Sequence, residues 1–323
     1  MTMTPEQAAW FQGTFARLVD NVDQAVMGKR EVIALVLSAM LAEGHVLLED
    51  APGTGKTSLA KALAATVQGT SSRIQFTPDL LPSDVTGVTI YDQNTRTFEF
   101  HRGPVFASIV LADEINRASP KTQSALLEVM EESRVTVDGH AHDVGRPFLV
   151  IATQNPIEQA GTYKLPEAQL DRFLIKTSIG YPDLDVAERI LAGAADRNPT
   201  AHLPAVITTG AVADMADLAS TAHTESAVLR YAAQLAEATR ADASTRLGVS
   251  VRGSLAMVRI AKVWAAAQGR HYVIPEDVKA LAGPVWTHRL VLDSEAEFAG
   301  VTAETVLARA LDAVPAPQAR SAA

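Results

Sequence analysis

The sequence predicts an α/β domain built on a parallel sheet, followed by a smaller all-α domain. Short continuous apolar runs alternate with helical segments in the first part of the chain, which is typical of buried parallel strands. A glycine-rich loop joins the first of these runs to a helix. From residue 183 onward the pattern is almost only alanine-rich helical periodicity. We therefore place the domains at residues 1–182 and 183–313, with a frayed tail at 314–323.

Composition limits what the protein can be. The 323 residues leave room for about two domains. Lysine and arginine number 28 against 37 aspartates and glutamates, and the net charge of −9 argues against a dominant nucleic-acid surface. The chain has no cysteine, which excludes disulfides, thiolate metal sites and cysteine nucleophiles. No membrane span or secretory leader is evident, so we expect a cytoplasmic protein without direct membrane insertion.

The elements of the first domain follow from apolar spacing and stop signals. Apolar residues at helical spacing predict helices within residues 1–44, and Gly44 ends the last of them before a strand at 45–48. A helix begins near Lys56 and runs to about Val67. The remaining regular elements are strands at 73–77, 108–112, 148–153 and 174–179 and a helix at 122–132.

Two β-hairpins interrupt this alternation. The first joins residues 88–91 to 97–101, and the second joins 134–138 to 141–144. His140 and His142 lie in the second hairpin, flanked by Asp138 and Asp143, so a metal site is one interpretation of this segment. A solvated hairpin is the preferred interpretation, because no cluster of other ligands supports the metal.

The strongest local signal is the Walker A segment DAPGTGKT at residues 50–57, which lies between an apolar strand and a helix. Its glycines let the backbone wrap around phosphate, and the helix N-terminus faces the anion. Lys56 is expected to reach the β- and γ-phosphates of ATP, and Thr57 to ligate Mg²⁺. The general motif begins with glycine, where this chain has Asp50. The predicted nucleotide-binding residues of this segment are Pro52, Gly53, Thr54, Gly55, Lys56, Thr57 and Ser58.

The apolar strand at 108–112 ends in two carboxylates, Asp113 and Glu114, in the manner of a Walker B sequence. Such strand ends lie at the edge of an α/β sheet where ligands bind. Asp113 would hold Mg²⁺, directly or through water, and Glu114 would act as general base on the attacking water. Taken alone, an acidic helix start explains the pair equally well; the Walker A segment favours the catalytic interpretation.

Together with later segments of the chain, these elements resemble the AAA+ ATPases, and most closely the MoxR family in the clade with an insertion in its second helix. The resemblance runs from about residue 26 to residue 282. The segments that carry it are LEDAPGTGKT at 48–57, LADEINRA at 111–118, KTQSALLE at 121–128, ATQNP at 152–156 and LPEAQLDRF at 165–173. It implies an AAA+ nucleotide-binding domain followed by a helical lid, with ATP bound between them.

The resemblance also implies roles by position. Asn155 matches the sensor 1 residue, whose amide positions the attacking water, although an Asn-Pro turn is the alternative. Arg172 matches the arginine finger, which enters the neighbouring subunit's site, although a surface pair with Asp171 is the alternative.

Two further matches are weaker. Arg252 matches sensor 2, but Val251 stands where the family usually has proline, and whether Arg252 acts in cis or in trans stays open. Gly28 lies in a segment that matches the family's adenine contact, with a turn before an ordinary helix as the alternative. The hairpins at 88–101 and 134–144 correspond to insertions that face the pore or the partner in related rings, and solvated hairpins are equally compatible.

The function implied by the resemblance is Mg²⁺-dependent ATP hydrolysis by a homo-oligomeric ring, expected to be a hexamer. MoxR proteins typically act with von Willebrand factor A domain proteins to mature or activate other protein complexes. We therefore expect a chaperone-like hydrolase with such a partner and no nucleic acid. A chelatase-like motor, a nucleic-acid motor of the same clade and a non-hydrolysing nucleotide switch are the alternatives.

Overall fold

The computed structural model describes residues 2–154, 163–192 and 199–317. By its contacts the chain divides into two compact units that interleave along the sequence. The α/β unit comprises Arg17–Arg172 and Thr177–Asp214, and the helical unit comprises Met1–Ala16, Phe173–Lys176 and Met215–Ala323. Because the units interleave, the division at residue 182 that sequence order suggests stays a proposal.

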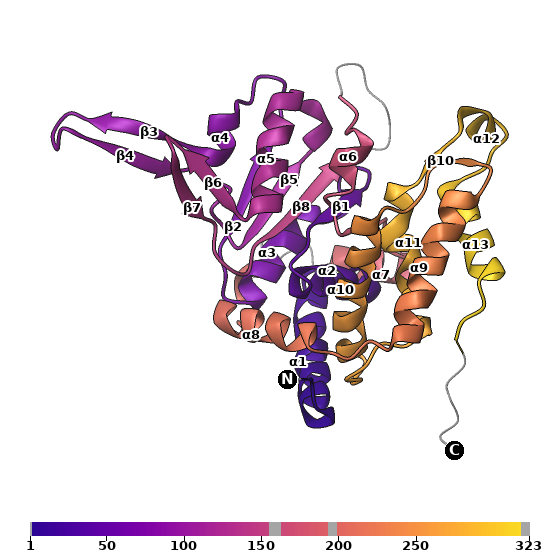
Figure 1. Ribbon diagram of the computed structural model, residues 1–323. Helices are drawn as coiled ribbons and strands as arrows, with labels where there is room; N and C mark the ends of the chain where they lie inside the picture. Colours follow the sequence, from indigo (N-terminus) through magenta and orange to yellow (C-terminus); the bar gives the residue numbers. More distant parts are fainter. Residues whose placement is uncertain (1, 155–162, 193–198, 318–323) are drawn as a thin grey trace. The chain divides into compact units, whose positions relative to one another are not determined.

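A five-stranded sheet in the order β2-β5-β8-β1-β9 forms the centre of the fold (Figure 1). Its strands are β1 (Val46–Glu49), β2 (Ser71–Gln75), β5 (Ile109–Asp113), β8 (Leu149–Gln154) and β9 (Ile175–Thr177). β8 pairs in parallel with β1 and β5, and β5 with β2. Every residue of β5 is buried, as expected for a strand with both faces covered. The predicted parallel sheet is therefore confirmed.

The long helices of the α/β unit begin and end near their predicted positions. They are α2 (Arg30–Leu41), α3 (Lys56–Thr66) and α5 (Pro120–Glu132). α5 begins at a strong start signal, in which the Ser119 hydroxyl accepts the Thr122 N–H and Pro120 takes the first helical position. Two short helices, α4 (Pro82–Thr86) and α6 (Glu167–Leu170), were not predicted, because four or five residues are too few to show a helical period.

Both predicted hairpins are present. β3 (Gly87–Asp92) pairs antiparallel with β4 (Thr97–Arg102), and β6 (Arg134–Val137) with β7 (His140–Asp143). The β3–β4 hairpin extends beyond the body of the α/β unit (Figure 1). Its base is tight, because a Cβ on Gly87 would lie 2.3 Å from the His101 carbonyl oxygen and one on Gly103 would lie 2.4 Å from the Val85 carbonyl oxygen.

Aromatic side chains line the first hairpin. Tyr91 and Phe98 are exposed and their rings lie 5.1 Å apart. Phe100 stacks on His142 of the second hairpin at 4.2 Å, so the two hairpins touch through these rings. Among the described residues no group of three metal-ligating side chains is present, and the hairpin histidines do not form one.

The helical unit is built mainly from α9 (Ser226–Ala241), α10 (Val251–Ala267), α11 (Pro275–Trp286) and α13 (Ala303–Ala313). It also contains β10 (Thr245–Leu247) and β11 (Val291–Leu292), a short antiparallel pair that the helical pattern hid. None of the described helices is long and apolar enough to cross a membrane. The remaining helical segments of the described chain are distributed over the two units. They are α1 (Pro5–Asp23), η1 (Ile115–Arg117), α7 (Leu184–Ala192), η2 (Pro199–His202), α8 (Thr209–Ser220), η3 (Thr287–Arg289) and α12 (Ser294–Phe298).

Two polar side chains are buried at η3 in the helical unit. His288 and Arg289 are each 7% exposed. Burial lowers the pKa of His288 well below its ordinary value, and the adjacent Arg289 guanidinium lowers it further. His288 is therefore neutral in the folded protein.

We expect this histidine to make folding pH-dependent. The unfolded chain binds a proton at His288 below about pH 6.5, whereas the folded chain binds it only at a lower pH. The contribution of neutral His288 to stability is therefore complete above that pH and is lost as the pH falls. The loss approaches about 1.4 kcal/mol per pH unit below the unfolded pKa. His288→Gln should reduce this dependence, which thermal unfolding of both proteins across mildly acidic pH would measure. Parallel pH dependences in the two proteins would contradict a neutral buried His288.

Candidate functional site

The loop between β1 and α3 has the backbone shape that an anion requires. Gly53 has φ +85° and Gly55 has φ +94°, which only glycine adopts readily. Gly55 caps α3, whose first N–H groups have no acceptor within the helix. A Cβ on either glycine would meet nothing within 4 Å, so both glycines border open space. The loop can therefore surround a phosphate with backbone N–H groups and a helix N-terminus.

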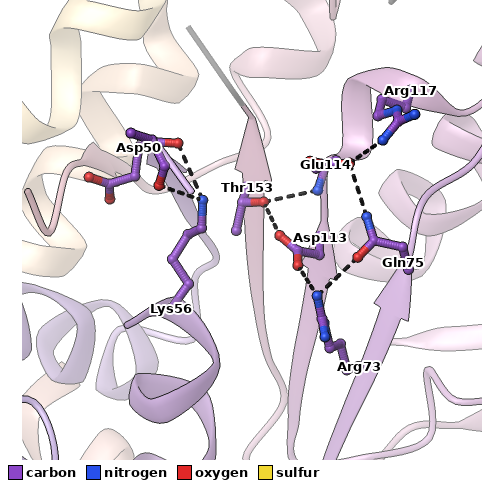
Figure 2. A network of polar contacts seen from close by, with 9 residues as sticks. Asp50, Lys56, Arg73, Gln75, Asp113, Glu114, Arg117 and Thr153 are labelled. Atoms are coloured by element: carbon purple, nitrogen blue, oxygen red, sulfur yellow. Dashed lines mark hydrogen bonds and ion pairs between the residues drawn. The ribbon is translucent and has the colours of Figure 1, made fainter. Parts of the chain in front are cut away.

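Lys56 reaches back over this loop (Figure 2). Its ammonium donates to the carbonyl oxygens of Asp50 and Ala51, each at 3.3 Å. Thr54 is buried and its hydroxyl donates to Ala51 O at 3.4 Å. Thr57 and Ser58 lie in the first turn of α3, half-buried, and Pro52 is exposed. The structure thus brings together the loop residues that the motif assigns to nucleotide binding.

Asp50 anchors the start of the loop. Its carboxylate is buried and accepts the N–H groups of Ile179 at 2.7 Å and Gly180 at 2.8 Å, together with the Ser178 hydroxyl at 3.3 Å. Glycine, which opens the general motif, could make none of these bonds. The sequence marked Asp50 only as a departure, and the structure gives it a partner segment far away in the chain.

Asp113 and Glu114 lie at the end of β5, as predicted. The Thr153 hydroxyl on β8 donates to Asp113 Oδ1 at 2.6 Å and accepts the Glu114 N–H at 2.9 Å. Glu114 has φ +56°, an uncommon conformation for a residue with a side chain. Thr153 therefore fixes both candidate residues across two neighbouring strands.

Three further side chains surround these carboxylates, and none of them was assigned to this pair from the sequence (Figure 2). Arg73 on β2 pairs with Asp113 Oδ2 at 2.6 Å and donates to Gln75 at 3.0 Å. Gln75 and Arg117 donate to Glu114 Oε2 at 3.1 and 2.7 Å. The signal in the sequence was the spacing of Arg73 and Gln75 on one face of β2, but only the β2–β5 pairing reveals what they face.

The oxygen-rich set suits a magnesium ion. The Thr57 hydroxyl and the Asp113 carboxylate are hard oxygen donors, which Mg²⁺ prefers, and it usually takes few ligands from protein. The Asp113 carboxylate already engages a cation, the Arg73 guanidinium, so its position favours positive charge. These residues fit the metal that the motif implies.

The other predicted site residues lie on elements other than the phosphate loop and β5. Arg172 follows α6 and pairs with Glu131 at the end of α5, at 3.1 Å. Gly28, with φ +74°, donates its N–H to Asp23 at 3.0 Å and approaches Val186, where a Cβ would lie 2.9 Å from a methyl carbon. Arg252 lies in the first turn of α10 in the helical unit. Asn155 lies outside the described residues.

Comparison with known proteins adds independent support. A family described as "ATPase family associated with various cellular activities (AAA)" matches residues 45–175, and one described as "AAA lid domain" matches 237–310. A Bacillus subtilis protein named YeaC is 47% identical over 95% of this chain and 96% of its own length. Chaperone MoxR1 of Mycobacterium tuberculosis is 40% identical over 94% and 83% of the two chains.

Two further relatives agree. Protein MoxR of Paracoccus denitrificans is 34% identical over 83% of this chain and 85% of its own. A crystal structure of a candidate ATPase from Cytophaga hutchinsonii superimposes with a TM-score of 0.90, at 36% identity, over 97% of this chain and 98% of its own. The order of an ATPase domain followed by a helical lid is therefore confirmed.

Because Asp50 holds the start of the loop, we expect its replacement by glycine, the residue of the general motif, to reduce both stability and ATP binding. Asp50→Gly would leave the buried Ile179 N–H and the part-buried Gly180 N–H without their acceptor, at about 1–3 kcal/mol for the buried group and less for the other. We expect lower stability in urea unfolding and weaker ATP binding. Asp50→Asn, which keeps one acceptor oxygen, is the matched control and should lose less. Equal stability of Asp50→Gly and the parent protein would show that the anchor contributes nothing.

Proposed function

This chain belongs to the MoxR family of AAA ATPases, and we propose from that premise that its ATP hydrolysis depends on Mg²⁺ and is completed between the subunits of a ring. We further propose that the ring remodels, matures or activates partner protein complexes. The observation that most supports the catalytic part is the position of Lys56 and of the Asp113–Glu114 pair. They follow β1 and β5, whose carboxyl ends lie at one edge of the same parallel sheet.

In this proposal the loop residues bind the triphosphate. The N–H groups of 53–58 and the Lys56 ammonium bind the β- and γ-phosphates, and the carbonyl oxygens of Asp50 and Ala51 orient that ammonium. Gly28 contacts the adenine ring of ATP. Thr57 and Asp113 would hold Mg²⁺, which would supply positive charge to neutralise the phosphates. Pro52, Thr54 and Ser58 shape the loop around them.

Glu114 acts as the general base. Its carboxylate accepts the proton of the attacking water, with Asn155 positioning that water. In the structure the Glu114 carboxylate is held by Gln75 and Arg117, which both donate hydrogen bonds to it. Both of these donors engage Oε2, and in this proposal Oε1 accepts the proton of the water.

The proposed ring depends on the role of Arg172 as an arginine finger. An arginine finger stabilises the transition state in the neighbouring subunit, so hydrolysis needs at least two subunits, and a hexamer is the assembly we propose. As the proposed sensor 2 residue, Arg252 contributes a second positive charge near the bound nucleotide. The relatives named MoxR include one named as a chaperone, which supports the remodelling role. A von Willebrand factor A domain protein is the partner that we propose. The location proposed for the protein is the cytoplasm.

Loss of the phosphate-binding ammonium should abolish nucleotide binding. We expect Lys56→Ala to lose ATP affinity by at least about 100-fold, because no other side chain of the loop replaces that charge. Fluorescent-nucleotide titration would measure this, and Lys61→Ala, an exposed lysine on the same helix, is the matched control. Normal affinity of Lys56→Ala would refute the assignment of the loop.

Completion of the site between subunits should make activity depend on concentration. We expect the rate per subunit to rise with protein concentration, with Glu114→Gln as the blank. Arg172→Ala should bind ATP normally and hydrolyse it about 1,000-fold more slowly. A constant specific activity over a range in which light scattering detects only monomer would contradict the shared site.

A further inference from the structure

We propose that Arg289 is the positioning residue for Arg172, because it fixes the backbone that directly follows Arg172 and joins it to the helix that carries Arg252. His288 assists it. The inference rests on the proposed action of Arg172 in the neighbouring subunit's site. It extends that proposal by identifying what sets the position of the finger within its own subunit.

The contacts begin at the two residues after Arg172. Arg289 Nη2 donates to the Phe173 carbonyl oxygen at 2.7 Å, and Nη1 donates to the Leu174 carbonyl oxygen at 3.2 Å. His288 Nε2 lies 3.1 Å from the same Phe173 oxygen. A planar guanidinium with donors to two successive carbonyls restrains the direction of the backbone as well as its distance. Segment 173–174 is thus held at its main chain.

Burial makes this restraint stiff. Phe173 is 0% exposed, Leu174 2% and Arg289 7%. A buried guanidinium that loses its acceptors is costly, so the cation and the carbonyl oxygens are expected to move together. Phe173–Lys176 belongs to the helical unit, which also contains Arg289, whereas Arg172 ends a stretch of the α/β unit. The peptide bond between Arg172 and Phe173 is therefore a junction between the two units.

The same guanidinium packs against the start of α10. A Cβ on Gly253 would lie 2.8 Å from Arg289 Cδ and 3.2 Å from Nε, so only a glycine admits the side chain there. Trp286 Nε1 donates to the Gly253 carbonyl oxygen at 3.0 Å and holds this turn of the helix in place. Gly253 follows Arg252 directly in the chain. Arg289 therefore connects the backbone beside one predicted catalytic arginine to the backbone beside the other.

It follows from this proposal that the positions of Arg172 and Arg252 depend on each other. A displacement of the first turn of α10 that moves Gly253 presses on Arg289, and Arg289 transmits it to the carbonyl oxygens next to Arg172.

The test separates action in trans from a merely structural role. Arg289→Lys keeps the charge but replaces the planar donor with a point charge. We expect about a 10- to 100-fold loss in kcat with ATP affinity little changed. The unfolding temperature should fall, because buried carbonyl oxygens lose donors. Arg270→Lys, which alters another partly buried arginine of the same unit, is the matched control and should retain kcat.

Subunit mixing then locates the defect. Arg289→Lys subunits are mixed with excess Glu114→Gln subunits, which cannot hydrolyse ATP but keep an intact Arg172 and Arg289. If Arg289 acts through the finger, the intact fingers restore turnover in the Arg289→Lys sites, as they should for Arg172→Ala. Lys56→Ala, which is defective in its own site, should not recover.

The outcomes distinguish this inference from the function on which it rests. Failure of Arg172→Ala to recover would overturn the finger in trans itself. Recovery of Arg172→Ala without recovery of Arg289→Lys, or normal kcat of Arg289→Lys alone, would overturn the positioning role. If Arg289→Lys does not fold, Gly253→Ala takes its place in the same mixing experiment, because its Cβ displaces Arg289. Recovery would support the inference and its absence would overturn it.

Discussion

The carboxyl edge of the parallel sheet is the constraint on which the rest of this structure depends. Parallel pairing of β1, β8 and β5 brings the Walker A loop, Thr153 and the Asp113–Glu114 pair to one edge, although they are about a hundred residues apart at the extremes. Thr153 links the two carboxylate residues from the neighbouring strand. Without this edge the same motifs would be unrelated segments of sequence.

The anchoring of the phosphate loop by Asp50 is a second consequence of the same edge. The segment after β9 returns beside the loop, and its N–H groups end at the Asp50 carboxylate. Lys29 reaches the same segment, donating to the Tyr181 carbonyl oxygen at 2.8 Å. The segment that leaves the sheet toward α7 is thus attached both to the phosphate loop and to the neighbour of Gly28.

Sequence predicted the parts of the site that are local in the chain. Lys56, Asp113 and Glu114 were found because their motifs place strand, loop and helix in one short window. Arg73, Gln75 and Thr153 were not, because strand order is a property of the folded sheet. The β10–β11 pair was hidden for a similar reason, since two- and three-residue strands show no period within a helical region. The roles of Arg172 and Arg252 came from resemblance and stay proposals.

The tight base of the β3–β4 hairpin determines how the hairpin can move. With Gly87 and Gly103 packed so closely that neither admits a Cβ, the two strands cannot separate at their root without moving backbone. α4 leads into that base, and the chain just before α4 is bonded to α5, because the Thr122 hydroxyl donates to Leu80 O at 2.7 Å. The base of the hairpin is therefore held by backbone contacts, and the exposed Tyr91 and Phe98 lie on strands that this base fixes.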